Sequence, residues 1–429
     1  MPVKRLSRRR FAGLMVTAPA LVRAPRTAFG AAPLRIVVIG GGAAGATTAR
    51  LLAREGGDRL DITLVERDTR YTSCFQSNLY LGGYRPLSAL THDYQRLART
   101  DGIDIVHAMA TRIDRDRQAV HLADGRQLSY DRLVVSPGID LVYDSVPGYS
   151  ESAAELAPHA WQDAVQLQRL KSRLDALQNG ENVVIVAPPN PYRCPPGPYE
   201  RASMIARQFR RRGLTDSRVT IIDAKRSFSK QALFEAGWRR HYPDVIEWFP
   251  SDVHGGILSI DAAAGTVETD LDTFRGALLN VIPAQRAGTI AQQAALTDAS
   301  GFCPIDPATM RSSVDSAISV LGDACVAGDM PKSAFAAHSQ ARVAAAALLR
   351  ELLGRPIAPP RFGNICWSLI DDDDAIKVGG SYAPSGDRIE SIGSFISQPS
   401  DASGTRASNY TESIAWYESI TSDMFGNGA

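Results

Sequence analysis

Five cysteines supply the most reactive side chains of this chain, and they are scattered along the sequence. No Cys-x-x-Cys pair and no Cys-x-x-Cys-His segment occurs, so the sequence predicts neither a metal site nor an attached haem on this chain. Widely spaced thiols can instead be nucleophiles, redox partners, attachment points for a cofactor, or small buried hydrophobes. The five are Cys74, Cys194, Cys303, Cys325 and Cys366.

A glycine-rich segment near the start predicts the cofactor. It has the βαβ pattern of a dinucleotide-binding unit, in which glycines let the backbone approach a pyrophosphate at a helix N-terminus and an acidic residue holds the ribose hydroxyls. We therefore expect bound FAD and flavin-dependent redox chemistry. The parts of the pattern are a β-branched run at 34–39, then Gly40, Gly42 and Gly45, an alanine-rich stretch at 43–54, a second run at 61–65, and Glu66.

Two later segments resemble parts of the flavin domain in flavoproteins that have two dinucleotide-binding domains. The strand-like run before Gly138 is similar to the segment that returns beneath the flavin. The segment containing Gly322 and Asp323 is similar to the closing flavin motif, where the aspartate would contact the ribityl chain. Lys332, at the start of the next predicted helix, would add positive charge that favours an anionic reduced flavin. Because the two segments lie far apart, an inserted unit must interrupt the FAD domain.

The insert repeats the βαβ theme with prolines in place of glycines. Runs at 182–187, 199–212 and 218–222 predict a strand, a helix and a strand. The loop at 188–198 has prolines where glycines would cradle phosphates, and proline lacks the N–H that binds them. We expect that a nicotinamide site has been lost here, and that Cys194 in this loop faces the ring surface where hydride would normally arrive.

These patterns predict the α/β class, with two Rossmann-like dinucleotide-binding domains and a C-terminal interface domain. A chain of 429 residues has room for two or three domains. The expected boundaries are 1–32 for a signal peptide, 33–150 and 276–355 for the two parts of the FAD domain, 151–275 for the domain that resembles an NAD-binding one, and 356–429 for a domain that covers the flavin.

The N-terminus is typical of a twin-arginine export signal. Arg8, Arg9 and Arg10 precede Phe11, a modestly apolar run and small residues up to 32; the alternative is a basic disordered tail. This route carries folded proteins, so it suits a flavoprotein that is loaded in the cytoplasm and works in the periplasm. In an oxidising compartment, five cysteines leave at least one without a disulfide partner.

Charge and hydropathy exclude two classes of partner. Removing residues 1–32 removes seven basic and no acidic residues, which leaves 40 basic and 46 acidic ones. A mildly acidic chain without a basic patch is not expected to bind nucleic acid. No apolar run approaches the roughly 20 residues of a spanning helix, so no membrane span is expected.

Several other residues have both a chemical and a structural interpretation. Glu200 could accept a proton beside Cys194, or could simply favour the N-terminus of its helix. Cys303 and Cys325 are expected to be structural, and His338 is a weak candidate at a helix start. The acidic run at 371–374 cannot direct every carboxylate at one ion, so we expect a solvated loop there.

Cys74 and Cys366 have open roles on the residues alone. Cys74 follows the second strand closely, which brings it past the flavin ring, where it could be packed, redox-active, or joined to the flavin methyl group as a thioether. Cys366 could oxidise with Cys194 to a disulfide that relays two electrons, or the two could be unrelated thiols.

From about residue 34 to its C-terminus the chain resembles the flavoprotein subunit of flavocytochrome c sulfide dehydrogenase. The most specific block is Cys-Pro-Pro-Gly-Pro-Tyr-Glu-Arg, which begins at Cys194. The other matching motifs are the glycine fingerprint, Cys74 with Ser77-Asn78 and Gly82-Gly83, Tyr130-Asp131 with Pro137-Gly138, Pro283 with Gln285-Arg286-Ala287-Gly288, and Gly322-Asp323.

The resemblance implies that Cys74 carries FAD through a thioether and that Cys194 and Cys366 form a redox disulfide beside the ring. It also implies periplasmic oxidation of sulfide to sulfur or polysulfide, with electrons passing to a separate c-type cytochrome subunit. The sequence departs from the family pattern around Cys366 and at Cys325, which leaves substrate and partner open.

Three alternatives fit the same motifs. One is the flavoprotein of a Sox sulfur-oxidation system, and another is a non-catalytic flavoprotein assembly factor, whose flavin no sulfur compound would reduce. The third, a sulfide:quinone oxidoreductase, would need an amphipathic C-terminal anchor. The tail at 411–429 has apolar residues at helical spacing among acidic ones and no lysine or arginine. We expect it to pack against this protein or its partner.

Overall fold

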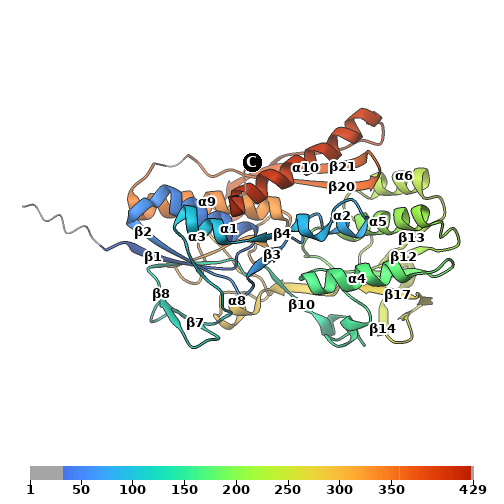
Figure 1. Ribbon diagram of the computed structural model, residues 1–429, viewed down its shortest axis with the longest axis horizontal. Coiled ribbons are helices and arrows are strands. Elements are labelled where there is room, and N and C mark those ends of the chain that lie inside the picture. Colours follow the sequence, from blue (N-terminus) through green and yellow to red (C-terminus); the bar gives the residue numbers. More distant parts are fainter. Residues whose placement is uncertain (1–31, 357, 427–429) are drawn as a thin grey trace, which may run out of the picture. The chain divides into compact units, whose positions relative to one another are not determined.

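The computed structural model describes residues 32–356 and 358–426, so the predicted signal peptide lies outside the described residues except for Ala32 (Figure 1). The first dinucleotide-binding unit is built on a parallel five-stranded sheet in the order β19-β9-β1-β2-β5. Its central strands are continuous apolar runs because both faces are covered. The strands are β1 (Leu34–Ile39), β2 (Leu60–Val65), β5 (Asp104–Val106), β9 (Arg132–Val135) and β19 (Ile318–Val320).

Two alanine-rich helices of this unit pack against each other. The helix α1 (Ala43–Gly56) starts directly after the glycine turn and contacts β1 and β2. It packs closely on α9 (Ala334–Leu353), because alanines such as Ala46 and Ala341 are fully buried and let the helix axes approach. The N-terminus of α9 is capped by Ser333, whose Oγ accepts from the N–H of Ala336.

The second unit has a parallel four-stranded sheet in the order β13-β12-β11-β17. From the sequence we expected this domain to end at residue 275. Its fourth strand lies at 278–281, so the sheet extends a few residues beyond that boundary. The elements of this unit are β11 (Val183–Ala187), β12 (Val219–Asp223), β13 (Ile246–Phe249), β17 (Leu278–Val281), α4 (Ala164–Ala176), α5 (Gly197–Arg212) and α6 (Gln231–His241).

The C-terminal domain is an antiparallel sheet of β20 (Phe362–Asp371), β21 (Asp374–Ser385) and β22 (Arg388–Ile396). The long helix α10 (Ser403–Phe425) lies along this sheet and also contacts α1 (Figure 1). The prediction that the acidic tail packs against the protein is confirmed, because Tyr417, Ile420 and Met424 are buried.

Smaller elements connect these three parts. A two-stranded ribbon of β10 (Ile139–Val142) and β18 (Ala284–Ala287) marks the two crossings between the dinucleotide-binding units. The remaining elements are β3 (Arg70–Thr72), β4 (Thr91–Asp93), β6 (Ala110–Asp114), β7 (Ala119–Leu122), β8 (Gln127–Ser129), β14 (Ile257–Asp261), β15 (Thr266–Thr269), β16 (Thr273–Arg275), α2 (Ser77–Leu81), α3 (Gln95–Asp101), α7 (Ser251–His254) and α8 (Thr289–Gln293).

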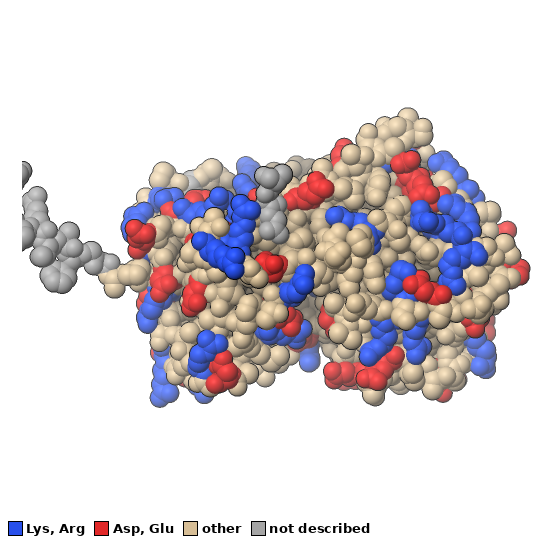
Figure 2. All heavy atoms as spheres, viewed as in Figure 1, with Lys and Arg blue, Asp and Glu red and all other residues tan. Residues whose placement is uncertain are grey.

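Charged side chains of both signs are interspersed over the face shown in Figure 2. Basic ones gather where α5 and α6 lie, since the last turns of both helices are rich in arginine. Within the described residues, no helix combines the length and apolarity needed to span a membrane.

The acidic run at 371–374 is not the solvated loop that the sequence suggested. It is the tight turn between β20 and β21, and Asp371 and Asp374 are each 5% exposed. His241 lies between them, with Nδ1 3.1 Å from one carboxylate and Nε2 2.6 Å from the other. Arg210 of α5 donates to Asp371 at 2.6 Å, and Arg406 of α10 pairs with Asp374. The prediction was wrong because cations distant in sequence converge on this turn and neutralise it.

Replacing Asp371 by asparagine should lower the free energy of unfolding by about 2 kcal/mol, because the buried carboxylate loses its charged hydrogen bonds with Arg210. Burial opposes ionisation of Asp371, but the hydrogen bonds from Arg210, from the N–H of Asp372 and from Tyr242 outweigh it and lower its pKa. The lowered pKa stabilises the fold above the usual aspartate pKa, and this contribution is lost as the pH falls through the folded value. The difference between variant and wild type should therefore shrink in acid.

The measurement is urea unfolding at pH 7 and at decreasing pH. Asp373→Asn is the matched control, because Asp373 lies in the same turn but is exposed, and asparagine tolerates its φ of +54°. Equal stability of the two variants at pH 7 would contradict the prediction.

Candidate functional site

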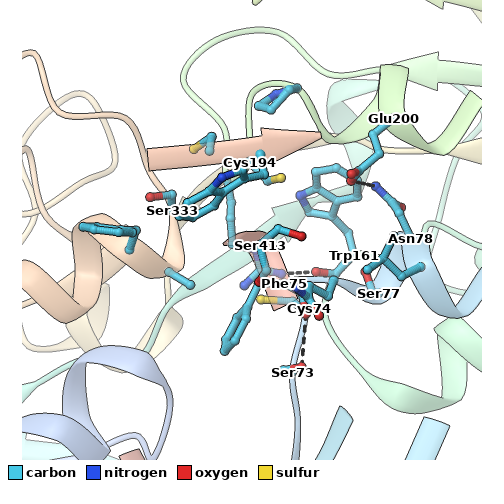
Figure 3. Close-up of a pocket in the computed structure, with 18 of the residues that line it drawn as sticks. Ser73, Cys74, Phe75, Ser77, Asn78, Trp161, Cys194, Glu200, Ser333 and Ser413 are labelled. Carbon is cyan, nitrogen blue, oxygen red and sulfur yellow. Dashed lines mark hydrogen bonds between the residues drawn. The ribbon is translucent and has the colours of Figure 1, made fainter. Parts of the chain in front are cut away.

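One cavity collects three of the five cysteines from segments far apart in the sequence. Cys74 comes from the turn between β3 and α2 and Cys194 from the loop before α5 (Figure 3). Cys366 comes from β20. All three are partly accessible and all are free thiols in this structure, so the disulfide that the resemblance implies is not formed here. Cys303 and Cys325 are fully buried and do not line the cavity.

The backbone of the proline loop fixes Cys194. Its φ is +59°, and its N–H donates to the carbonyl oxygen of Lys332 at 2.8 Å, at the start of α9. The N–H of Arg193 donates to Oε1 of Gln285 at 2.8 Å, and the N–H of Gly197 donates back to the Cys194 carbonyl at 2.8 Å. These bonds anchor the loop of the second unit to the first unit, so Cys194 lies where the two units meet.

Cys366 is held by a strand and by a polar group on its sulfur. Nδ2 of Asn364 lies 3.5 Å from its Sγ, within the range for a bond to sulfur. Ser333, the N-cap of α9, donates to Oδ1 of Asn364 at 2.6 Å, and Cys366 Sγ lies 3.6 Å from the same oxygen, so both ends of the amide contact the thiol. Burial raises the pKa of Cys366, and the amide acts in the opposite direction.

Glu200 lies in a position that fits both alternatives left by the sequence. It lies in the first turn of α5, and its carboxylate also lines the cavity. One oxygen accepts from Nδ2 of Asn78 at 2.8 Å, and the other accepts from the N–H of Leu369 at 2.8 Å (Figure 3). Burial raises its pKa despite these bonds, which moves the group towards the range of a proton acceptor and donor near neutral pH.

Sequence reasoning missed a buried cation at this site. Lys230, directly before α6, is 5% exposed, and its Nζ donates to the carbonyl oxygen of Cys366 at 3.0 Å and to Oγ of Ser368 at 2.8 Å. Burial lowers its pKa to about 8. No spacing in the sequence signals this residue, because it reaches Cys366 only through the packing of α6 against β20.

Aromatic side chains complete the wall of the cavity. Trp416 of α10 stacks on Phe335 with ring centroids 6.0 Å apart, and Trp367 lies 5.4 Å from the same indole. Trp161, which is 6% exposed, closes another side, and its Nε1 has no partner among the described residues. No signal in the sequence marks these residues as part of a site, because isolated aromatics are common in cores.

The glycine turn has the geometry of a pyrophosphate cradle. A Cβ on Gly45 would lie 1.8 Å from the carbonyl oxygen of Gly40, and Gly40 itself has a φ of +94°, so both positions require glycine. A Cβ on Gly42 would meet only Tyr71, at 3.8 Å, so the chain's own packing does not demand glycine there. The free space beside Gly42 is what a phosphate approaching the start of α1 needs.

The two acidic residues predicted for the cofactor follow strands of the same sheet, Glu66 after β2 and Asp323 after β19. Oε2 of Glu66 accepts from the N–H of Gly41 at 2.7 Å. Oδ1 of the buried Asp323 has no hydrogen-bond donor among the described residues, and Arg193 lies 3.9 Å from its other oxygen. An orphaned buried acceptor here suits a ribityl hydroxyl, so the residues present fit FAD.

The other predicted cofactor residues have supporting positions. Gly138 and Gly322 have φ of +68° and +74°, which fit the turns after β9 and β19. Lys332 does not point at the cavity: Nζ donates to the carbonyl oxygens of Asp323 and Cys325, both at 2.8 Å, and so holds the closing motif in place.

His338 is tied to α10. Its Nε2 lies 3.0 Å from Oδ2 of Asp423 at the end of that helix. Burial lowers its pKa, so the ring tends to be neutral. It does not line the cavity and therefore joins two helices instead of taking part in the site.

The second unit uses its own acidic residue internally. Asp223 ends β12, where a nucleotide-binding domain would present a ribose acceptor, but it is 0% exposed. Its carboxylate accepts from Tyr199 at 2.6 Å and Trp248 at 2.9 Å, and Nζ of Lys225 lies 2.6 Å away. These contacts engage the carboxylate within this chain; the loss of a nicotinamide site stays a prediction.

Replacing Gly45 by alanine should prevent FAD loading, because the new methyl group would collide with the Gly40 carbonyl and open the turn. The measurement is the ratio of flavin to protein absorbance after purification. Gly404→Ala is the control, since a Cβ there meets nothing within 4 Å. Full flavin content in the Gly45 variant would refute this account of the turn.

Comparisons with known proteins cover most of the chain. Residues 167–283 match the family "Sulfide dehydrogenase [flavocytochrome c] flavoprotein chain, central", and residues 358–425 match "Flavocytochrome c sulphide dehydrogenase, flavin-binding". Residues 34–186 match the pyridine nucleotide-disulphide oxidoreductase family.

Individual relatives are more distant. The mitochondrial sulfide:quinone oxidoreductase of Dictyostelium discoideum is 22% identical over 336 residues, which cover 75% of this chain and 72% of that protein. The sulfide-quinone reductase of Aquifex aeolicus is 31% identical over 182 residues, 42% of this chain and 40% of that protein. The solved sulfide:quinone oxidoreductase structure from Aquifex aeolicus has a TM-score of 0.70 at 17% identity and covers 91% of this chain and 92% of its own. At that identity the structural likeness shows the fold.

Proposed function

The chain belongs to the flavoprotein subunits of flavocytochrome c sulfide dehydrogenase, and on that basis we propose that it oxidises sulfide with FAD and the Cys194–Cys366 pair and passes the electrons to a separate c-type cytochrome subunit. The observation that carries the proposal is the meeting of Cys74, Cys194 and Cys366 around one cavity. The two reactive thiols come from different domains, so only the folded chain brings them together.

The chemistry of the cysteine pair begins with the disulfide. Hydrosulfide attacks one sulfur, a new S–S bond forms as the old one breaks, and the products are a persulfide on one cysteine and a thiolate on the other. A second hydrosulfide then removes the outer sulfur as HSS⁻ and leaves a dithiol. Reforming the disulfide releases two electrons and two protons. Bound FAD would supply a two-electron acceptor that can release electrons one at a time.

Glu200 is the group placed to take up and return protons beside this pair. Its carboxylate lines the cavity and is oriented by Asn78 and the Leu369 N–H, and burial raises its pKa. Asn78 is itself held by Nε of Arg201 at 3.1 Å, a fully buried guanidinium. These hydrogen bonds fix the orientation of the carboxylate. A carboxyl group that is held in place and has a raised pKa is suited to proton transfer at thiols.

A cytochrome acceptor fits the C-terminal helix better than a quinone does. Four large apolar or aromatic residues of α10, Tyr417, Ile420, Met424 and Phe425, are buried against this chain, and Tyr417 bonds Ser73 at 3.0 Å and the Ala89 carbonyl at 3.1 Å. That face is therefore not available to insert into a lipid interface. Location in the periplasm rests on the arginine motif in residues 1–32 and is part of the proposal.

The proposal is tested by adding sulfide without oxygen to the purified holoprotein and recording the flavin spectrum, first alone and then with a c-type cytochrome or with a water-soluble quinone. Sulfide should bleach the flavin, and the cytochrome should be reduced while the flavin is reoxidised. A flavin that sulfide leaves oxidised would refute the activity. If only the quinone reoxidised the flavin, the electron acceptor would be a quinone instead of a cytochrome.

The variants Cys194→Ser and Cys366→Ser should each slow sulfide-driven flavin reduction by at least about a thousandfold, because neither leaves a disulfide to attack. Stopped-flow absorbance measures the rate, with FAD content checked for each protein. Cys303→Ala is the control, since Cys303 lies outside the cavity lining. Near-normal rates in either serine variant would eliminate the disulfide route.

We also propose that Cys74 holds FAD through a thioether. It lines the cavity and is partly accessible, and the orphaned Asp323 acceptor and the space beside Gly42 support FAD binding in the same domain. Acid-precipitated wild-type protein should stay yellow, whereas Cys74→Ala should release its flavin into the supernatant. A colourless wild-type pellet would disprove the tether while leaving FAD binding itself intact.

A further inference from the structure

A buried ammonium group without a carboxylate partner lies next to the two reactive cysteines. Among the described residues, no Asp or Glu oxygen comes within 4.0 Å of Lys230 Nζ, although the side chain is only 5% exposed. Its two bonds go to neutral acceptors, the Cys366 carbonyl and the Ser368 hydroxyl. Burying an ammonium ion is costly unless a negative charge accompanies it. Lys230 is therefore poised for a charge that arises at the cysteines during the reaction.

The surroundings of Lys230 decide which thiol carries that charge. The titratable groups that face it are Cys366 from β20, Glu200 from α5, and Cys194 from the loop before α5. It contacts the backbone of Cys366 directly, and the sulfur of that residue also has the Asn364 amide. Cys194 has no comparable donor on its sulfur in the described structure, whereas the carboxylate of Glu200 opposes a negative charge at both thiols.

The two cysteines are therefore electrostatically unequal. Burial raises the pKa of both, but Lys230 is the largest opposing influence at Cys366 and only a minor one at Cys194. Cys366 also lies beside Ser333 at the N-terminus of the 20-residue helix α9, an end that favours negative charge. In thiol–disulfide exchange the sulfur with the lower pKa leaves more readily.

We propose that Lys230 is a positioning residue that makes Cys366 the leaving thiolate, so that sulfide attacks Cys194 and the sulfane sulfur is carried there. This rests on the proposed sulfide oxidation. The sulfur–sulfur bond breaks with its electron pair going to Cys366 Sγ, and the attacking sulfur bonds to Cys194 Sγ. The hydrosulfide proton stays on the persulfide or passes to Glu200, so the step needs no external oxidant.

The test uses the full-length holoprotein, reduced with dithiothreitol and then freed of it, with no sulfide present. It is alkylated with iodoacetamide at pH 7, where Lys230 keeps its charge, and peptide mass spectrometry follows the rate at each cysteine separately. In the wild type, Cys366 should react first, at least about tenfold faster than Cys194. If Cys194 reacted first, or both reacted alike, the proposal would be overturned whatever the variants did.

The variants then ask whether Lys230 causes the difference. Lys230→Met should slow alkylation of Cys366 at pH 7 by about tenfold or more, while Lys230→Arg keeps the charge and should restore the order. Lys171→Met, which removes a partly buried lysine of α4 outside the cavity lining, is the control and should change nothing. A purely structural role would leave the Cys366 rate unchanged in the methionine variant, and that result would also overturn the proposal.

A sulfide arm locates the sulfane sulfur. After brief anaerobic treatment of the wild type, trapping with iodoacetamide should place the added sulfur on the Cys194 peptide, and finding it on the Cys366 peptide would reject the assignment. The two proposals fail differently. A wild type that does not react with sulfide refutes the activity, whereas the alkylation order is measured without sulfide and judges Lys230 by itself.

Discussion

A buried polar network holds the three cysteine-bearing segments in one place, and the site depends on it. Arg201 of α5 donates to Asn78 of α2, Asn78 donates to Glu200, and Glu200 accepts from the N–H of Leu369 in β20. The network thus joins the segment after Cys74, the helix after Cys194 and the strand that carries Cys366. Arg201 is fully buried and also donates to the carbonyls of residues 159 and 160. A charge enclosed in this way permits very few arrangements, because every lost partner leaves a buried donor unsatisfied.

The two dinucleotide-binding units show how the same βαβ plan serves two ends. In the first, Gly40 and Gly45 are demanded by close backbone contacts, and Gly42 leaves open space at the start of α1. In the second, the equivalent loop bonds through Cys194 to Lys332 of the first unit, and Asp223 is enclosed by donors of its own chain. The second unit therefore presents a thiol at the junction, where its counterpart leaves space for a phosphate.

The C-terminal domain is joined to the second unit by charge as well as by apolar packing. At the turn of its sheet, Arg210 of α5 contacts Asp371, and His241 of α6 contacts both Asp371 and Asp374. The same packing of α6 against β20 carries Lys230 to the backbone of Cys366. In a nucleotide-binding domain, the role of such a helix would be to cover a sheet. Here α6 also brings a cation to the reactive pair.

The sequence by itself determined the features that are local. The spacing of Gly40, Gly42 and Gly45 between a strand and a helix, the prolines around Cys194, and the apolar periodicity of the C-terminal tail each predict a structure within one segment, because hydrogen bonding and side-chain direction repeat over a few residues. Family resemblance then supplied the expected pairing of Cys194 with Cys366. The edge of the second sheet was misplaced by a few residues, because nothing near residue 275 marks a strand that pairs with one almost a hundred residues earlier.

Only the tertiary structure decided which charges are buried and what they face. The acidic turn at 371–374 looked solvated because its cations come from α5, α6 and α10, and Lys230 gave no signal because its partners lie on β20. Electrostatic energy depends on distance in space and on burial, and neither is encoded in the residues next to a charge. The cysteines could be recognised from the sequence, whereas the inequality between them arises from the fold.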